Sequence, residues 1–275
     1  MNKPALYSKH ASPAIFDYYQ NVMENYFPLI RHGTNGTSDK FILDIGCGPG
    51  ETTHDVILPY VDKEINTIIG VDISASMIDF AQKTYGNERI RFQEVDVAGS
   101  LPEEFVERFD YIVSFMAFHW IPDQRKLYSN ILKMLKPNGG FLSIYVAKSK
   151  VVDIYEEISK NAEYVPYISK AKYNPPPFQK SNDPEKELRS ILNEIGFENS
   201  YCKMEEVGLP HKTREDSEGY FVSLSPYHDY IPKHMQKKFI SDHVDLLDTV
   251  TGANGEKEYY VSHNLFLTHG RKASS

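Results

Sequence analysis

Cysteine, tryptophan and long apolar runs are scarce in this chain of 275 residues. It contains two cysteines, Cys47 and Cys202, and one tryptophan. Two cysteines are too few for a disulfide framework, and they lack the spacing of a metal site. No apolar run approaches the roughly 20 residues of a membrane span, and the first residues lack an apolar signal segment. We therefore expect a cytoplasmic globular protein with no bound metal and no membrane insertion.

Basic residues are also fewer than acidic ones. The chain has 30 Lys and Arg and 38 Asp and Glu, which gives a net charge of −8. An acidic chain is a poor ligand for a polyanion, so we expect no nucleic-acid partner. The contents of 41% hydrophobic and 25% charged residues are typical of a globular protein. A chain of this length can bury a core without cross-links.

Apolar runs alternate with helical periodicity in the first half of the chain. Strands separated by helices over about 20–30 residues require right-handed crossovers and an open parallel sheet. The sequence therefore predicts an α/β fold with helices on both faces of the sheet. The predicted strands cover residues 41–45, 66–73, 89–97, 109–118 and 141–147, and the predicted helices cover 53–61 and begin at Ser74 and Asp123.

The second half is less regular. A helix is expected over 151–162, and another begins at Asp183, with Pro184 in its first turn and Gly196 after its end. Helical apolar spacing also extends over 232–250. Strands are expected over 201–207 and 259–267.

A glycine-rich turn, Gly46-Cys47-Gly48-Pro49-Gly50, follows the first predicted strand. Glycines there permit positive φ and let backbone N–H groups approach a ligand. The Gly-Lys-Ser/Thr sequence of a phosphate loop is absent, and Glu51 occupies the third glycine position of a dinucleotide fingerprint. An acidic residue there favours a ligand that carries positive charge as well as a carboxylate.

Aspartates end successive strands beside this turn. Asp72 lies 22 residues after Gly50, where a carboxylate can accept hydrogen bonds from both hydroxyls of a ribose. Asp96 ends the third strand and can accept a hydrogen bond from an adenine amino group. Each aspartate alone could be a turn residue or a helix cap. Together with Asp44, they indicate a ligand site at the carboxyl edge of the sheet.

The segments D-I-G-C-G-P-G, G-V-D-I-S, V-D-V and L-K-P-N-G-G, within about residues 40–147, resemble class I S-adenosylmethionine-dependent methyltransferases. This resemblance implies S-adenosyl-L-methionine as cofactor. It also implies a Rossmann-like, seven-stranded, mostly parallel sheet whose last strand, 259–267, is antiparallel and lies beside the fifth. The cofactor-binding residues that it implies are Asp44, Gly46, Cys47, Gly48, Gly50, Asp72, Ile73, Met77, Asp96, Val97 and Ser114.

A narrower resemblance spans nearly the whole chain. Leu6-Tyr7, S-F-M-A-F-H-W-I-P-D-Q, D-P-E-K-E with L-N-E-I-G-F, and S-P-Y-H-D-Y-I-P are similar to the insect juvenile hormone acid O-methyltransferases. Members of that family methylate the carboxylate of farnesoic acid or of juvenile hormone acids. We therefore expect one methyltransferase domain over 1–275. It would comprise an N-terminal helical cap segment (1–35), a cofactor-binding core (40–147), and cap helices with the remaining strands (148–275).

The acceptor decides whether a catalytic base is needed. A carboxylate with a pKa of about 4 is ionised at neutral pH, whereas a phenol with a pKa of about 10 is not. Trp120 offers an indole N–H on an apolar body, which suits a carboxylate on a lipid-like chain, although a packing role is the alternative. His119 is a second candidate catalytic and substrate-binding residue. For a carboxylate substrate we favour a donor or structural role for it over that of a base.

One position departs from the narrower family, which usually has a substrate-holding glutamine where this chain has Ala14. Gln20, six residues on and more than a helical turn away, is the candidate substitute that we name for substrate binding. The alternatives are methylation of another acid, methylation of a hydroxyl or amine with His119 as base, and non-catalytic binding of a hydrophobic acid. The oligomeric state is not predicted.

Overall fold

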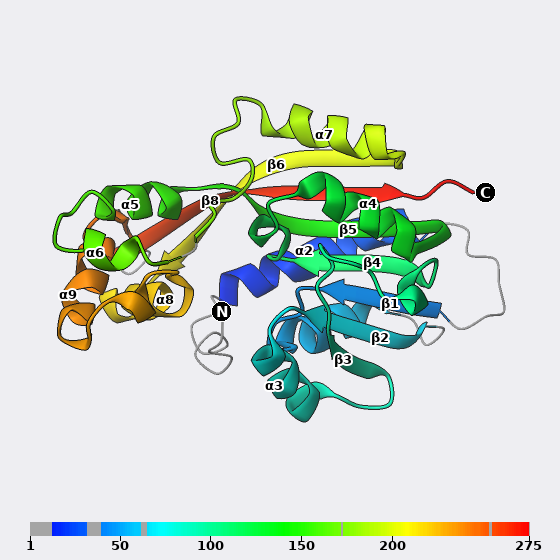
Figure 1. Cartoon of the computed structure of the whole chain (residues 1–275), viewed down its shortest axis with the longest axis horizontal. Helices are drawn as coiled ribbons and strands as arrows, with labels where there is room; N and C mark the ends of the chain where they lie inside the picture. The colour runs from blue at the N-terminus through cyan, green and yellow to red at the C-terminus, as the bar shows by residue number, and fades with distance from the viewer. Residues whose placement is uncertain (1–12, 32–39, 62–64, 172, 253–254, 275) are drawn as a thin grey trace.

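The computed structural model describes residues 13–31, 40–61, 65–171, 173–252 and 255–274, and its centre is one twisted sheet (Figure 1). The predicted α/β fold is confirmed. The strand order is β3-β2-β1-β4-β5-β8-β6, and a short strand, β7, pairs with β8 outside this path. The strands are β1 (Lys40–Ile45), β2 (Ile65–Asp72), β3 (Ile90–Glu94), β4 (Phe109–Phe115), β5 (Leu135–Ser149), β6 (Glu198–His211), β7 (Asp248–Thr251) and β8 (Lys257–Arg271).

Strand direction follows the expected pattern. β1, β2, β3, β4 and β5 form parallel pairs, whereas β8 is antiparallel to both β5 and β6. The last strand thus inserts beside the fifth, as the resemblance implied. Within the described residues the sheet has eight strands rather than the expected seven, because residues 248–251 also pair with β8. The helical spacing over 232–250 was therefore misleading at its end, and helix α9 (Lys233–Val244) stops before β7.

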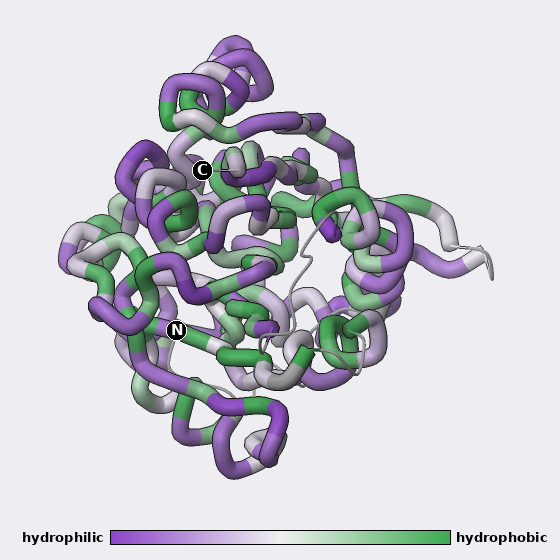
Figure 2. The backbone as a smooth tube through the Cα atoms, turned by 90° about the vertical axis from the view of Figure 1, so that its right-hand side faces the viewer, coloured by the Kyte–Doolittle hydropathy of each residue, from purple (hydrophilic) through white to green (hydrophobic). Residues whose placement is uncertain are grey.

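Helices cover both faces of the sheet. Side chains alternate along each strand, so that Ile42 of β1 joins one apolar cluster and Leu43 joins the other. α2 (Pro13–Ile30) and α3 (Ala75–Tyr85) pack on the first face, and α4 (Gln124–Met134) and α7 (Pro184–Ile195) pack on the second. Hydrophilic stretches dominate the periphery in the end-on view (Figure 2). Among the described helices, none is both long and apolar enough to cross a membrane.

Several predicted helix ends are confirmed by their capping contacts. Asp123 accepts a hydrogen bond from the Lys126 N–H at 2.9 Å, and Asp183 accepts one from the Lys186 N–H at 3.1 Å. Gly196 closes α7 with a φ of 101°. The segment predicted as a helix over 53–61 forms two short, differently wound turns instead, η1 (Thr52–Ile57) and η2 (Leu58–Tyr60).

A second group of helices lies beyond the carboxyl end of β5, around the extended ends of β6 and β8 (Figure 1). We call this group the cap. It comprises α5 (Lys150–Ile158), α6 (Val165–Ile168), α8 (Arg214–Leu224) and α9. Aromatic edge contacts hold it together, such as Tyr164 with Phe239, whose ring centroids are 5.0 Å apart. The N-terminal helix α2 runs along the sheet and contacts β5 and β8.

Candidate active site

The glycine turn after β1 is fixed to its neighbours by backbone contacts. The N–H groups of Gly46 and Cys47 both donate to the Val71 carbonyl, at 2.7 and 3.0 Å. Gly46 has a φ of 74°, and a Cβ there would lie 2.1 Å from the Ala117 Cβ, so only glycine fits. Gly48 has a φ of 53°, but an added Cβ would meet no protein atom within 4 Å. Gly46 thus packs the turn, and Gly48 faces open space.

The aspartates that end β2 and follow β3 lie beside this space. Asp72 accepts the Gly48 N–H on Oδ2 at 3.1 Å and the Ser74 N–H on Oδ1 at 2.8 Å. Asp96 accepts the Ala98 N–H on Oδ1 at 2.9 Å. A carboxylate has about four acceptor positions, so each side chain keeps acceptor capacity beyond these contacts. The backbone contacts hold the carboxylates at the sheet edge, where they line a cleft.

This strand-end cleft encloses about 1350 Å³ between protein atoms, part of it open to solvent. Its lining comes from the residues that follow β1, β2, β3 and β4, and Ile73 on its rim is 69% exposed. The predicted cofactor residues that line it are Gly46, Gly48, Asp72, Ile73, Met77, Asp96 and Val97.

The remaining predicted cofactor residues, which are Asp44, Cys47, Gly50 and Ser114, do not line this cleft. The buried Asp44 side chain accepts a hydrogen bond from Thr53 Oγ1 at 2.6 Å, and burial raises its pKa to about 7. Ser114 is buried and donates to the Ile45 carbonyl at 2.8 Å.

The Gly50 Cα packs near Ala81. The Cys47 thiol is buried, which raises its pKa, and Cys47 lines a smaller cavity beside the turn. The structure therefore places these residues where they support the turn.

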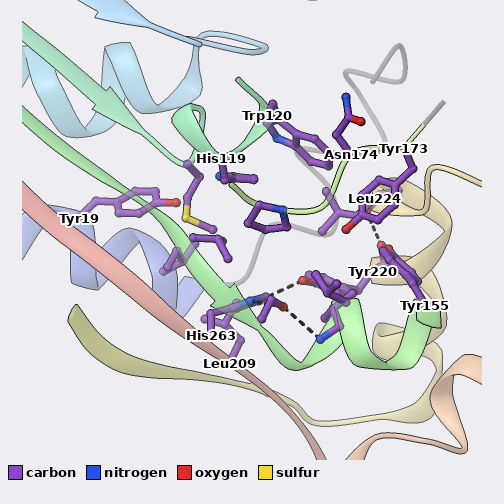
Figure 3. Close-up of a pocket in the computed structure, with 18 residues that line it drawn as sticks. Tyr19, His119, Trp120, Tyr155, Tyr173, Asn174, Leu209, Tyr220, Leu224 and His263 are labelled. Carbon is purple, nitrogen blue, oxygen red and sulfur yellow. Dashed lines mark hydrogen bonds between the residues drawn. The ribbon is translucent and has the colours of Figure 1, made fainter. Parts of the chain in front are cut away.

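A second, mostly apolar cavity lies between the sheet edge and the cap (Figure 3). It encloses about 980 Å³ between protein atoms, part of it open to solvent. We call it the cap cavity. Among the residues that the structure describes, none of the side chains that line it is an Asp, Glu, Lys or Arg. They are Ile15, Tyr19, Met116, His119, Trp120, Val146, Ser149, Val151, Val152, Tyr155, Tyr173, Asn174, Pro176, Leu209, Tyr220, Ser223, Leu224 and His263.

Met116 and Trp120 line both the strand-end cleft and the cap cavity. Met116 follows β4 directly and has a φ of 56°, an uncommon backbone state that occurs often at functional sites. Trp120 ends the short turn η4 (Phe118–Trp120) and is 41% exposed. The segment after β4 is therefore the wall at which the two cavities meet.

His119 points into the cap cavity beside Trp120, with their ring centroids 4.9 Å apart (Figure 3). Its Nδ1 is buried and has no hydrogen-bond partner among the described residues. Burial, with a smaller contribution from His263, lowers the pKa of His119 to about 3. The imidazole is therefore neutral at pH 7.

The candidate substrate-binding residue in the N-terminal helix α2 does not line either cavity. Gln20 is exposed on α2 and lines neither cavity, whereas its neighbour Tyr19 lines the cap cavity. Ala14 lies in the first turn of α2, and Leu6-Tyr7 lie outside the described residues. The structure thus brings Trp120 and His119 together and leaves Gln20 apart from them.

Sequence reasoning missed several polar side chains that line the cap cavity, among them Ser149, Tyr220 and His263. They come from β5, α8 and β8, and no local motif joins them. Over the described part of the chain, no three His, Cys, Asp or Glu side chains gather in a way that could hold a metal ion.

The fold, the glycine turn and the two aspartates at one sheet edge define an S-adenosylmethionine-dependent methyltransferase, with S-adenosyl-L-methionine as its cofactor. The family model described as a methyltransferase domain matches residues 37–260, and the chain belongs to this family. The open space at Gly48 and the acceptor atoms of Asp72 and Asp96 fit an adenosine-bearing ligand.

Curated relatives confirm the narrower resemblance. The juvenile hormone acid O-methyltransferase of Drosophila melanogaster is 25% identical over 279 residues, which cover 99% of this chain and 93% of the relative. The enzyme of the same name from Bombyx mori is 27% identical over 206 residues, which cover 75% of this chain and 73% of the relative.

Solved structures show the same fold. The YcgJ protein from Bacillus subtilis has a TM-score of 0.56 at 19% identity, covering 94% of this chain and all of its own. A Haemonchus contortus phosphoethanolamine N-methyltransferase, solved with S-adenosylhomocysteine, has a TM-score of 0.55 at 16% identity, covering 98% of this chain and 57% of its own.

Proposed function

We propose that this methyltransferase is a carboxyl O-methyltransferase that converts a hydrophobic sesquiterpenoid acid, of the farnesoic or juvenile hormone acid type, to its methyl ester. The proposal depends on one observation. Met116 and Trp120 line both the strand-end cleft and the cap cavity, so the two cavities share a wall. An acceptor in the cap cavity would therefore adjoin the methyl donor only at this wall. The similarity to the two juvenile hormone acid O-methyltransferases favours an acid as that acceptor.

The cavity lining supports an apolar substrate with one ionised end. The walls are mainly aliphatic and aromatic, so they favour a hydrocarbon chain and exclude water. When bound, S-adenosyl-L-methionine supplies an electrophilic methyl group. The acidic side chains Asp72 and Asp96 would hold its adenosine part in the cleft, and the Trp120 indole N–H would orient the acceptor carboxylate.

His119 bears on the choice between acceptors. A base for a hydroxyl or amine works best with a pKa near the working pH. The pKa of His119 is lowered to about 3 by burial, so its neutral ring is a weak base. A carboxylate is already ionised at neutral pH and needs no base. The electrostatics of His119 thus support the acid over a hydroxyl acceptor, with His119 acting as a neutral hydrogen-bonding group.

The test is methyl transfer from isotope-labelled cofactor to farnesoic acid, to a phenol and to a primary amine of similar size. We expect label in farnesoic acid alone, as an ester that mild alkali hydrolyses to methanol. Transfer only to the phenol or the amine would contradict the proposal. Cofactor binding without transfer to any acceptor would instead support a binding protein. The cytoplasmic location and the lack of a nucleic-acid partner stay predictions from the sequence.

A further inference from the structure

The buried side chain of Gln124 contacts the short turn η4, which carries His119 and Trp120. Gln124 is the first residue of α4, and its amide group reaches back toward η4. Its Nε2 donates to the Phe118 carbonyl at 2.9 Å and to the Ile121 carbonyl at 2.7 Å. Phe118 begins η4, and Ile121 follows its end. One amide group therefore joins the two ends of the turn.

The turn is short, and its internal hydrogen bonds are those of a single helical turn. The Trp120 N–H donates to the Ala117 carbonyl at 3.0 Å, and the Ile121 N–H donates to the Phe118 carbonyl at 3.1 Å. Ala117, which precedes the turn, has no side-chain oxygen that could cap it. A single turn is unstable alone, because fixing its backbone costs more than its few hydrogen bonds return. The contacts of Gln124 thus reinforce a weak local structure.

The amide of Gln124 is itself held in one orientation. A carbonyl oxygen only accepts, so the two carbonyls require the NH₂ end of the amide, and both of its protons are used. Its Oε1 accepts from the Tyr145 hydroxyl at 3.2 Å, and Tyr145 accepts from the Tyr128 hydroxyl at 3.1 Å. Gln124 is 5% exposed, and both tyrosines are fully buried. These bonds connect η4 to α4 and β5, which supply the two tyrosines.

The position of the Trp120 indole depends on the backbone of this turn. Phe118 is buried, and its ring packs against Tyr128 and Tyr145 with centroid distances of 5.8 and 5.5 Å. Trp120, two residues on, is partly exposed and lies where the two cavities meet (Figure 3). A displacement of about 1 Å in a group that orients a reactant can lower a rate about 100-fold. The hydrogen bonds of Gln124 therefore bear on the reaction as well as on the fold.

We propose that Gln124 is a positioning residue for methyl transfer, which holds η4 so that the Trp120 indole N–H faces the bound acceptor. The proposal rests on the proposed function, because it takes Trp120 as the group that orients the acceptor carboxylate. Gln124 itself lines neither the strand-end cleft nor the cap cavity, so it acts through the turn. The alternative is a purely structural role, in which the same hydrogen bonds stabilise the fold without setting the direction of Trp120.

The first measurement needs no substrate. Trp120 is the only tryptophan of the chain, so the fluorescence of the full-length protein reports the position of η4. Gln124→Met keeps a side chain of similar length and removes both donors to the turn. We expect the steady-state anisotropy of Trp120 to fall in this variant. Quenching by acrylamide should rise by up to about 2-fold, because the wild-type side chain is already 41% exposed.

The second measurement connects the turn to the reaction. We expect kcat for methylation of farnesoic acid to fall roughly 10- to 100-fold in Gln124→Met, the effect of a misplaced orienting group. The Kd of the acid, measured by calorimetry with S-adenosylhomocysteine present, should change only a few-fold, because the walls of the cap cavity keep their side chains. The Kd of S-adenosyl-L-methionine should change as little. A structural role alone would not separate kcat from these two binding constants.

Asp183→Ala is the matched control. It removes a hydrogen bond at the start of another helix, α7, and Asp183 lines neither cavity. Both variants should lower the Tm, the control by about 2–4 °C for the loss of an N-cap. Only Gln124→Met should change kcat or the fluorescence of Trp120.

Tyr145→Phe is a milder second variant. It removes the hydroxyl that donates to Gln124 Oε1 and leaves both donors to η4 in place. We expect the same changes as in Gln124→Met, at a smaller size. If Gln124→Met does not fold, wild-type fluorescence and kcat in Tyr145→Phe would overturn the proposal.

The outcomes separate the two proposals. Wild-type fluorescence and kcat in Gln124→Met, or equal changes in Asp183→Ala, would overturn the positioning role. Altered fluorescence with wild-type kcat would also overturn it, because Gln124 would then fix the turn but not the reaction. If the wild type methylates no acid, the proposed function is contradicted. The fluorescence of Gln124→Met then still supports or overturns the effect of Gln124 on Trp120.

Discussion

Thr53 Oγ1 donates a hydrogen bond to Asp44 Oδ2 at 2.6 Å, in the packed region behind the glycine turn. Asp44 is only 1% exposed, and burial, opposed by the Thr53 hydrogen bond, raises its pKa to about 7. The residue that opens the glycine motif thus contacts the turn η1 and does not line the cleft. The charge of Asp44, which packs behind the glycine turn, therefore changes near pH 7.

The first prediction concerns the free energy of unfolding as a function of pH. Between its ordinary pKa of 3.8 and about 7, Asp44 binds a proton in the folded chain that the unfolded chain has released. Its contribution to stability is therefore fully present below pH 3.8 and is lost as the pH rises to about 7. The variant Asp44→Asn keeps an acceptor for Thr53 and carries no charge, so we expect a smaller loss of stability over this range.

Urea unfolding of the wild type and of Asp44→Asn, at several pH values, measures this difference. His243 and His263, whose pKa values are both lowered to about 4 by burial, produce the opposite slope in the acid range. Their effect is the same in both proteins and cancels in the comparison. Parallel curves for the wild type and the variant would contradict the assignment to Asp44.

The second prediction concerns Gly48, whose added Cβ would enter the strand-end cleft. Gly48→Ala should weaken cofactor binding by at least about 10-fold, because the methyl group occupies ligand space and the backbone resists a φ of 53°. Gly196→Ala is the matched control, because Gly196 also has a positive φ and no protein atom near an added Cβ.

Calorimetry with S-adenosyl-L-methionine and urea unfolding distinguish these two effects. Both alanine variants should lose about 1–2 kcal/mol of stability, the cost of a left-handed backbone state for a residue with a side chain. Only Gly48→Ala should lose cofactor affinity. Normal cofactor binding by Gly48→Ala would show that the ligand lies elsewhere.

The third prediction concerns the carboxylate of Asp72. Asp72→Asn removes the charge that strengthens hydrogen bonds to ribose hydroxyls, at a cost of about 1.5–3 kcal/mol, or roughly 10- to 100-fold in cofactor Kd. The control is Asp123→Asn, because Asp123 also accepts a backbone N–H but does not line the cleft. An equal change in Kd for both variants would point to a general loss of structure.

The strands β1, β2 and β4 were predictable because each contains a short run of apolar residues. The short strand β7 was not, because Val250 and its neighbours are exposed and pair only through β8. The helix α8 was missed because it contains Gly219 and several weak helix formers. Its capping box, formed by Thr213 and Asp216, was a signal that the sequence did contain.

The site was predictable in part for the same reason. Strand ends can be read from the sequence, so Gly48, Asp72 and Asp96 were found, and the structure places them around one cleft. Ser149 and His263, in contrast, are 114 positions apart in the sequence and meet only through the pairing of β5 with β8. Periodicity contains no information about such contacts.

The fourth prediction concerns the indole N–H of Trp120. Trp120→Phe keeps an aromatic ring in the wall between the cavities but removes the donor that we assign to the substrate carboxylate. We expect kcat/KM for farnesoic acid to fall roughly 10- to 100-fold, the effect of losing one hydrogen bond to a charged group. The Kd for S-adenosyl-L-methionine, measured by calorimetry, should change only a few-fold. A loss of cofactor affinity as large as the loss of kcat/KM would assign Trp120 to the cofactor cleft alone.

The fifth prediction is a pH profile that tests whether His119 is a base. The pKa of His119 is about 3, and a carboxylic acid substrate is ionised above about pH 5. With S-adenosyl-L-methionine at saturation, so that the titration of Asp44 behind the glycine turn does not limit cofactor binding, we therefore expect kcat/KM for the acid to stay constant from about pH 6 to 9. Neither His119 nor the substrate titrates in this range. His119→Asn keeps a neutral polar side chain and should leave the profile flat, with activity within about 10-fold of the wild type. His119 would be a general base if wild-type activity rose across this pH range and His119→Asn both abolished that rise and lowered the rate about 100- to 10,000-fold. That result would shift the acceptor from an acid to a hydroxyl or amine, since only those groups need a proton removed before methylation.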